Sequence, residues 1–491
     1  MENNKCSSGS ACGLNRRQFL GGCASCAAGL AGMSVLGISA LTTRSAAAQQ
    51  LAPAAEKAKV RLVFSHEPPD VATWPNIGYD YEGRKRELTK KLSQACPDID
   101  FFPVTAKDPD AAKKILADDK EVDGYIAYML GLWTGAPAAI ADSGRPTIFV
   151  DDLYGGSGEF LTAYAAAKRK GLKVTGVSST RIEDVADAAK CFECMKKLRS
   201  SVILTVGAGS DWWGNIPDGP IKEQFGLKVI QLDFKQLAQA YEKADRNEAK
   251  KCADRWIKQA EKVVEPSRQE IEKSGAMYLA MFDLMQQHKA RAITINCLGG
   301  FYGGHMKAYP CLGFFQLNND GYVGACEADM RSTITMLLMT YLTGRPGYIS
   351  DPVIDIAKNQ IIYAHCVAPS KVYGPDGPSN PYHIRSHSED RKGAAVRSML
   401  PLGQMTTTIQ FDPRKRDGRG QVILHQGKSV ENIDEDKACR TKLAVEVKGD
   451  IDKLHNYWDE WGWHRVTYYG DLKRQVGHIA ALLGIEVIEE A

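Results

Sequence analysis

Side chains that can hold a divalent cation occur at four places in the second half of this 491-residue chain. Glu327, in "CEAD", precedes the apolar run "ITMLLMTYL"; Asp351 follows that run, and His365 and His464 lie in "YAHC" and "WGWHRV". Hard cations take oxygen donors and tolerate an imidazole, so such a set favours Mn²⁺ or Mg²⁺ over Zn²⁺, which prefers thiolates. The residue types therefore suggest a metal site, provided that the fold brings these separate segments together.

Each of these residues also has an ordinary structural interpretation. Glu327 and Asp329 would suit the start of a helix, where the helix dipole and capping favour acids. Asp351 precedes a proline, as turn and cap residues often do. His365 and His464 are equally compatible with structural histidines. The residue types alone leave both interpretations open.

The elements that must position these residues follow from the pattern of apolar runs. From about residue 60, short apolar segments such as "VRLVFS" and "RPTIFVDD" alternate with helical stretches, which is the βαβ rhythm of a parallel sheet. A second such unit is expected from about residue 170, with two long polar helices near 235–263 and 266–289. After residue 345, short strands separated by Gly, Pro and Asp turns indicate a mostly β domain that closes with a helix and a strand.

We therefore predict an α/β fold class with two Rossmann-like parallel-sheet domains followed by a mostly β, barrel-like C-terminal domain. Glu327 falls in the second of these domains, and Asp351 and His464 fall in the third. The predicted bounds are 51–168, 169–344 and 345–491.

The first 50 residues form a separate segment. Arg16 and Arg17 in "NRRQFLGG" precede a weakly apolar stretch rich in Gly, Ala and Ser, a layout that resembles a twin-arginine export signal with cleavage after Ala48. The stretch is too weakly hydrophobic for a stable membrane span. We expect the twin-arginine export machinery to carry the folded protein to the periplasm, a route that suits a protein loaded with its cofactor before export.

Charge and cysteine content exclude some classes of function. The chain has 62 basic and 59 acidic residues and a net charge of +3, without a basic block, so a nucleic-acid partner is not expected. Cys191 and Cys194 form a CxxC within the helical pattern "AAKCFECMKKL". They are either buried structural residues or a redox pair.

The segment from Thr294 to Val353, together with the C-terminal segment, resembles the L-fucose isomerase and L-arabinose isomerase superfamily. Fucose isomerases have a Glu in an acid-x-acid sequence before an apolar helix, an Asp 24 residues later, and a His in "HxVxxYG" before a helix and a "GIxV" strand. This chain has Glu327 in "CEAD", Asp351 at the same spacing, and "HRVTYYGDLKRQVGHIAALLGIEV" beginning at His464. Three ordered matches are more specific than any one of them.

The resemblance implies roles for the candidate residues. Glu327, Asp351 and His464 match the family's Mn²⁺ ligands, and the two carboxylates match its acid/base pair. His365 matches a further ligand of arabinose isomerases. Asp329 matches a position that is not a ligand, so we expect it to cap the helix.

The implied activity is that of a Mn²⁺-dependent aldose–ketose isomerase, an intramolecular oxidoreductase that moves a proton through an ene-diol, and the N-terminal segment leads us to expect that this relative is exported. Mg²⁺ or Co²⁺ are the other candidate ions, a small sugar is the expected substrate, and a homo-oligomer, a trimer or hexamer, is expected from the family. Because fucose and arabinose isomerases act in the cytoplasm, an alternative is a non-catalytic periplasmic carbohydrate-binding protein that keeps the isomerase fold.

Overall fold

The computed structural model describes residues 56–207, 216–416 and 419–491. The predicted signal segment 1–50, with Arg16, Arg17 and Ala48, lies outside these residues. Within the described ranges, no helix combines the length and the apolar character that crossing a membrane requires.

The first sheet is parallel throughout, with the strand order β2-β1-β3-β4-β5. Its strands are β1 (Ala58–Ser65), β2 (Ile99–Ala106), β3 (Gly124–Met129), β4 (Thr147–Asp151) and β5 (Val174–Ser178). The sequence pattern places residues 174–178 in the second unit, but they pair with β4 and complete the first sheet. An apolar strand carries no local signal for which sheet it will join, so this assignment depends on tertiary pairing.

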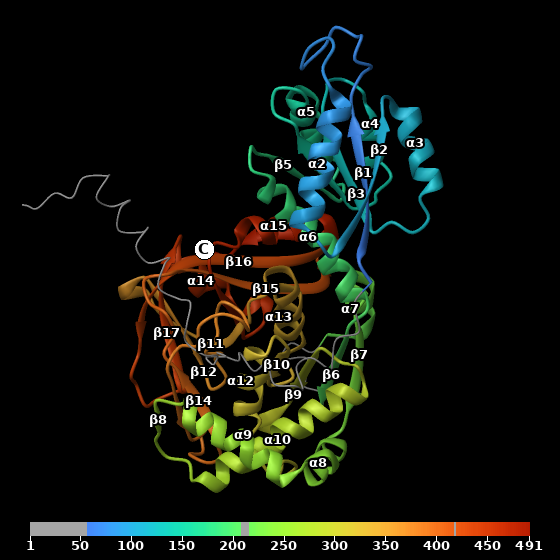
Figure 1. The fold of residues 1–491 in the computed structure, drawn as a ribbon. Coiled ribbons are helices and arrows are strands. Elements are labelled where there is room, and N and C mark those ends of the chain that lie inside the picture. Colours follow the sequence, from blue (N-terminus) through green and yellow to red (C-terminus); the bar gives the residue numbers. More distant parts are fainter. Residues whose placement is uncertain (1–55, 208–215, 417–418) are drawn as a thin grey trace, which may run out of the picture. The chain divides into compact units, whose positions relative to one another are not determined.

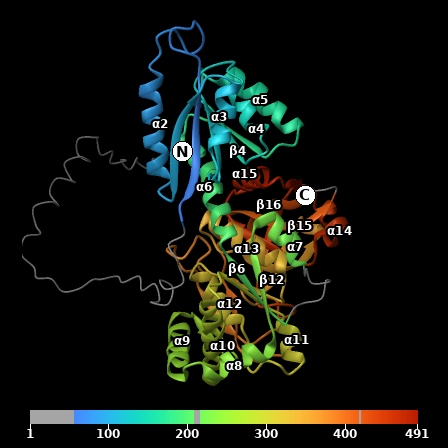
Figure 2. The same cartoon turned by 90° about the vertical axis from the view of Figure 1, so that its right-hand side faces the viewer.

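Helices cover both faces of the first sheet, as a doubly wound parallel sheet requires. Figure 2 shows α2 (Tyr81–Ala95) on one side and α3 (Pro109–Asp118), α4 (Ala136–Ala141) and α5 (Ser157–Arg169) on the other. The long helix α6 (Ile182–Arg199) packs against α2 and several strands. Cys191 and Cys194 lie on α6 and have no exposed surface, which supports their structural interpretation.

The second sheet is also parallel, in the order β10-β9-β6-β7 (Figure 1). Its strands are β6 (Val202–Val206), β7 (Lys228–Leu232), β9 (Ala292–Ile295) and β10 (Val323–Cys326). The helices of this region are α7 (Asp218–Phe225), α8 (Phe234–Lys243), α9 (Arg246–Gln259), α10 (Arg268–Gln287), α11 (Cys297–Tyr302), α12 (Cys311–Asn319) and α13 (Met330–Thr343).

The first of the two predicted long polar helices is in fact two helices. It breaks between α8 and α9, where the Asp245 side chain accepts hydrogen bonds from the backbone N–H groups of Asn247 and Glu248 and so begins α9. The end of the predicted helix forms the short strand β8 (Lys262–Val263). An aspartate favours a helix start over a helix interior, and this local signal was missed.

Helix α13 lies where it can position a site between two sheets. Almost all of its residues are buried, as expected of a helix that is apolar on all sides. It packs against β9 and β10 and also against two strands of the C-terminal domain, β15 and β18. It begins after Asp329 and ends at Gly344, whose φ of 70° is the left-handed conformation of a helix C-cap.

The C-terminal domain is a barrel-like sheet, in agreement with the prediction. The strand order is β15-β18-β11-β12-β17-β16-β19, and an additional β15–β16 pairing joins the ends of the first six strands. The strands are β11 (Tyr348–Asp355), β12 (Gln360–His365), β15 (Met405–Arg416), β16 (Arg419–Asn432), β17 (Thr441–Lys448), β18 (Arg465–Tyr469) and β19 (Glu486–Glu489). A smaller sheet has the order β14-β13-β8, from β13 (Tyr382–Arg385) and β14 (Ala395–Ser398).

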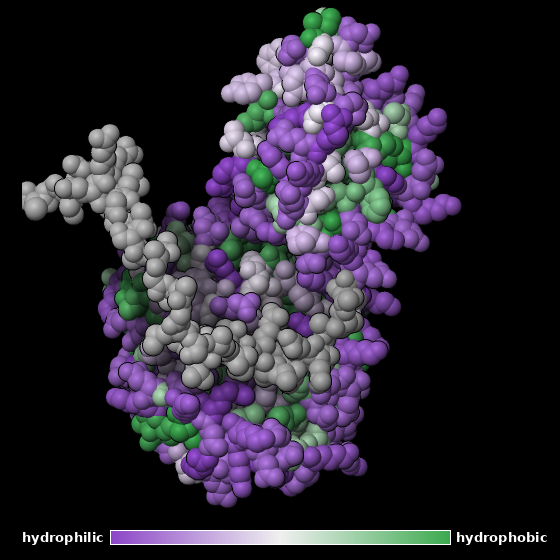
Figure 3. All heavy atoms as spheres, viewed as in Figure 1, coloured by the Kyte–Doolittle hydropathy of each residue, from purple (hydrophilic) through white to green (hydrophobic). Residues whose placement is uncertain are grey.

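Helical segments complete the C-terminal domain. They are α14 (Ile451–Tyr457), α15 (Lys473–Leu483) and the 3-10 turns η2 (Ile356–Lys358) and η3 (Trp458–Trp461). Helix α15 and strand β19 are the predicted closing helix and strand. On the face drawn in Figure 3, polar residues predominate and apolar residues are scattered among them, as expected for a chain of which 25% of the residues are charged.

Candidate metal centre

Asp351 and His464 meet because their strands are neighbours. Strands β11 and β18 are antiparallel and pair Ser350 with Arg465, so Asp351, one residue later, lies opposite His464, one residue earlier. His464 Nε2 is 3.2 Å from Asp351 Oδ1. Asp351 therefore lies within a strand, and its interpretation as a turn or cap residue is wrong.

His365 lies on β12, the other strand that pairs with β11, beside Asp351 and His464. It is the last residue of β12, and the residue before it, Ala364, pairs with Asp351. The ligand atoms of Asp351, His365 and His464 all lie within 4.8 Å of one another. The two imidazole rings are stacked, with centroids 5.7 Å apart.

Glu327 enters from the second sheet through a strained turn. It follows β10, and both Glu327 and Ala328 have left-handed backbones, with φ of 63° and 52°. Each such non-glycine residue costs about 1–3 kcal/mol and persists only where the surroundings impose it. Glu327 thus precedes the helix instead of lying in its first turn. Its Oε2 is 3.6 Å from His464 Nε2, and its Oε1 is 4.0 Å from His365 Nε2.

Asp329 joins the helix start to the site. As predicted, it is the N-cap of α13, and it accepts hydrogen bonds from Ser332 N at 3.0 Å and Ser332 Oγ at 2.8 Å. Its Oδ2 also lies 3.0 Å from His464 Nδ1, a contact that sequence reasoning missed. An ionised carboxylate only accepts hydrogen bonds, so His464 Nδ1 is the donor and the ring orientation is fixed.

The centre gathers three carboxylates around one buried imidazole. Burial disfavours the charged form of His464, but hydrogen bonds to Asp329 and Asp351 and the nearby Glu327 charge outweigh it and raise its pKa well above the usual value. Burial raises the pKa of Glu327, partly opposed by the neighbouring histidines. Burial also opposes ionisation of Asp351, yet its contacts with the histidines and Trp463 hold its pKa below the usual range. The site is built around a positive charge.

These residues fit a divalent cation. The Asp329 carboxylate is buried, and those of Glu327 and Asp351 are partly buried, with side chains 12% and 24% exposed. These three carboxylates exceed the single positive charge that His464 can supply, and hard dications favour carboxylate oxygens. His365 Nε2 is buried and makes no hydrogen bond within the described part of the chain. A buried polar atom without a partner, directed at this cluster, is consistent with a site that binds something further.

Three more side chains line the centre and were not expected from the sequence. Trp463 donates from Nε1 to Asp351 Oδ1 at 2.7 Å and is 46% exposed, so it lies between the centre and solvent. Cys439 Sγ is 3.8 Å from Asp351 Oδ2. The Cys326 thiol lies within 4.8 Å of ligand atoms of Glu327 and His365. Trp463 and Cys326 gave a signal that could have been used, because each is adjacent in sequence to a candidate residue, His464 and Glu327.

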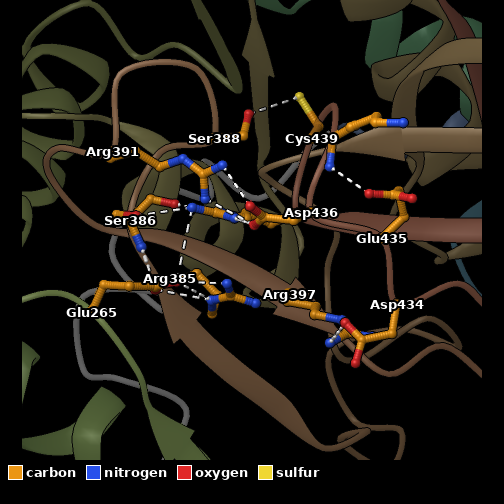
Figure 4. A network of polar contacts seen from close by, with 12 residues as sticks. Glu265, Arg385, Ser386, Ser388, Arg391, Arg397, Asp434, Glu435, Asp436 and Cys439 are labelled. Carbon is orange, nitrogen blue, oxygen red and sulfur yellow. Dashed lines mark hydrogen bonds and ion pairs between the residues drawn. The ribbon is translucent and has the colours of Figure 1, made fainter.

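A polar network holds the loop that carries Cys439 (Figure 4). Asp436 of this loop pairs with Arg391 at 2.7 Å and with Arg440 at 3.1 Å, and Ser388 Oγ lies 3.7 Å from Cys439 Sγ. Arg440 is nearly fully buried, whereas Arg391 and Asp436 are exposed, so the outer pair contributes little by itself. The network fixes the loop, and with it the thiol beside Asp351.

Comparison with known proteins identifies relatives of one kind. No family model matches the chain. Over 309 residues it is 25% identical to the sulfoquinovose isomerase of Clostridium sp. (strain MSTE9), a match that covers 60% of this chain and 66% of the relative. Over 320 residues it is 23% identical to that of Alkalicoccus urumqiensis, covering 62% and 69%. Over 207 residues it is 26% identical to that of Priestia aryabhattai, covering 41% and 44%.

The matches thus span between somewhat under half and about two thirds of these relatives. The identities are low, but each of the three relatives is named as an isomerase of a sugar. They support the resemblance to a sugar isomerase superfamily that the sequence motifs indicate, and with it an isomerase.

Proposed function

We propose that this protein is a metal-dependent aldose–ketose isomerase. The observation that carries the proposal is the convergence of Glu327, Asp351 and His464, from three separate segments, on one buried point: His464 Nε2 lies 3.6 Å from Glu327 and 3.2 Å from Asp351. The donor set suits Mn²⁺ or Mg²⁺, and the family resemblance favours Mn²⁺ as the proposed ion, with Mg²⁺ or Co²⁺ as alternatives.

The reaction needs a proton to move between two neighbouring carbons. Glu327 and Asp351 are the groups that would accept and return it, and proton transfer by such positioned groups typically contributes 10²- to 10⁴-fold. The raised pKa of Glu327, which results from burial, brings this carboxyl closer to neutrality and so suits a group that must both take and give a proton. When bound, the divalent ion would polarise the carbonyl and stabilise the negative charge that develops.

We propose a small sugar as the substrate. Sulfoquinovose is the first candidate to test, because the relatives are named as isomerases of that sugar. L-Fucose and L-arabinose follow, because the motif order resembles their isomerases. The half-exposed Trp463 beside Asp351 offers an aromatic face at the centre, and such faces suit sugar rings.

The test compares turnover with metal content. Dialysis against a chelator should abolish conversion of the aldose to its ketose, and Mn²⁺ should restore it. Glu327→Gln should eliminate turnover, whereas Glu121→Gln, which changes an exposed acid that pairs with Lys59, should not. Sugar binding that is unaffected by chelation, with no conversion of any sugar tested, would instead support the carbohydrate-binding alternative.

Export and assembly are part of the proposal. Replacement of Arg16 and Arg17 by Lys should retain the protein in the cytoplasm if the twin-arginine machinery carries it to the periplasm. A trimer or hexamer is proposed from the family resemblance. Sedimentation of the metal-loaded protein tests this, and a monomer would contradict it.

A further inference from the structure

The two histidines of the centre use their ring nitrogens in opposite ways. His464 Nδ1 donates to Asp329 Oδ2 at 3.0 Å. His365 Nδ1, in contrast, accepts a hydrogen bond of 2.9 Å from the backbone N–H of Cys366. A backbone N–H only donates, so the Nδ1 atom of His365 must carry a lone pair.

These partners decide which nitrogen is free to bind a metal ion. A neutral imidazole carries one proton, and a metal is bound through the nitrogen that lacks it. A bound dication would displace the second proton that the surrounding carboxylates favour on His464, and the remaining proton stays on Nδ1, so that Nε2 presents the lone pair. His365 keeps its proton on Nε2, the atom that faces the centre. For His365 to ligate through Nε2, its proton would have to move to Nδ1, and the buried Cys366 N–H would lose its acceptor. Leaving such a donor unpaired corresponds to a factor on the order of 10 to 100 in an equilibrium constant.

We propose that His365 donates a hydrogen bond from Nε2 to an oxygen of the sugar and is not a metal ligand, an inference that rests on the proposed isomerase function. The ring is buried, and Nε2 has no hydrogen-bond partner among the described residues. It faces Glu327 Oε1 at 4.0 Å, too far for a direct hydrogen bond. A single oxygen atom about 2.8 Å from both atoms bridges this distance.

A sugar oxygen at that position meets two complementary groups. The Nε2–H of His365 donates to it, while Glu327 accepts the hydroxyl proton or the neighbouring carbon-bound proton. The hydrogen bond strengthens as negative charge develops on the oxygen during the passage through the ene-diol, which is the property required of a group that accelerates the reaction. A neutral imidazole does this without adding a full charge to the ground state.

Pulsed electron paramagnetic resonance of the Mn²⁺-loaded protein tests the inference, because coordinated imidazole nitrogens modulate the echo. We expect one coordinated imidazole in the wild type. His365→Gln should retain that imidazole and bind Mn²⁺ within about threefold of the wild type, since the Gln amide keeps an N–H near the Nε2 position. The matched variant His464→Gln should lose the imidazole signal.

Turnover provides the second readout. His365→Ala should lower kcat by about 10²-fold, as loss of one such donor does elsewhere, and His365→Gln should recover part of that loss. Two coordinated imidazoles in the wild type, or Mn²⁺ affinity lowered more than about tenfold in His365→Gln, would overturn the inference and leave the metal-dependent isomerase intact. Failure of the wild type to bind Mn²⁺, Mg²⁺ or Co²⁺ would overturn both.

Discussion

Replacing Asp329 with Asn should weaken metal binding although Asp329 is not itself proposed as a ligand. Asp329 Oδ1 accepts from Ser332 N, and Oδ2 accepts from His464 Nδ1. The Asn amide matches this shape but presents an NH₂ group in place of one oxygen. An Asn N-cap accepts from the helix N–H through its amide oxygen, so the oxygen stays on Ser332 N and the NH₂ group faces His464. Two donors then oppose each other, and Nδ1 must give up its proton to Nε2.

The expected loss of Mn²⁺ affinity follows from the role of Asp329 in orienting His464. Removal of the group that orients a metal-binding histidine typically costs 10- to 100-fold in metal affinity. This corresponds to about 1.4–2.7 kcal/mol of binding free energy. Helix stability should change by much less, because Asn and Asp are similar N-cap residues. The effect is therefore expected in the dissociation constant for Mn²⁺ and not in the fold.

Titration calorimetry with Mn²⁺ is the assay, and Ser332→Ala is the matched control. That control removes the 2.8 Å hydrogen bond from Ser332 Oγ to Asp329 Oδ2 but keeps the carboxylate, so its Mn²⁺ affinity should stay within about threefold of the wild type. If Asp329→Asn binds Mn²⁺ as tightly as the wild type, the contact with Asp329 does not control the tautomer of His464, and the reasoning is refuted.

Three further predictions concern groups other than the proposed ligands. Glu490 accepts hydrogen bonds from the buried Arg465 guanidinium. Glu490→Gln leaves that charge uncompensated, so it should lower the free energy of unfolding, measured in urea, by about 3–5 kcal/mol. A loss below about 1 kcal/mol would contradict the importance of the pair. Burial, with a contribution from a nearby arginine, lowers the pKa of His478 to about 4 in the folded protein. As the pH drops, the unfolded chain therefore protonates His478 before the folded protein does. The free energy of unfolding should fall by roughly 3 kcal/mol between pH about 6.5 and 4. His478→Asn should flatten that dependence in urea titrations across the same range, and an unchanged slope would show that other groups cause it. Cys191 and Cys194 have no exposed surface, and burial raises the pKa of both thiols. Iodoacetamide should therefore leave both thiols unmodified in the native protein. Mass spectrometry that finds them alkylated would support the redox interpretation.

Much of the fold could be predicted from local patterns. The apolar run after Asp329 is the buried helix α13, and Asp329 caps it as expected. The alternating apolar runs are the strands of parallel sheets, and the turn-rich C-terminal region is the barrel-like sheet. These features depend on neighbouring residues in the chain, through side-chain periodicity, capping and turn chemistry, so they can be read from a single sequence.

Other features depended on contacts between distant segments. The sequence pointed to Asp351 and His464 through a resemblance, but only the pairing of β11 with β18 sets them opposite each other across more than 100 residues. The left-handed backbone of Glu327 was likewise invisible, because nothing in "CEAD" favours that conformation and only the surrounding structure imposes it.

The two histidines show most clearly what the sequence determines and what only the tertiary structure decides. The sequence by itself determined that four candidate ligands exist and that one acid begins a helix. The tertiary structure decided that Asp329 holds the proton of His464 on Nδ1, and that the backbone N–H of Cys366 holds the lone pair of His365 on Nδ1. Which nitrogen of a histidine carries the proton depends on the partner that faces the ring, and that partner is fixed by how strands pack, not by the order of residues around it.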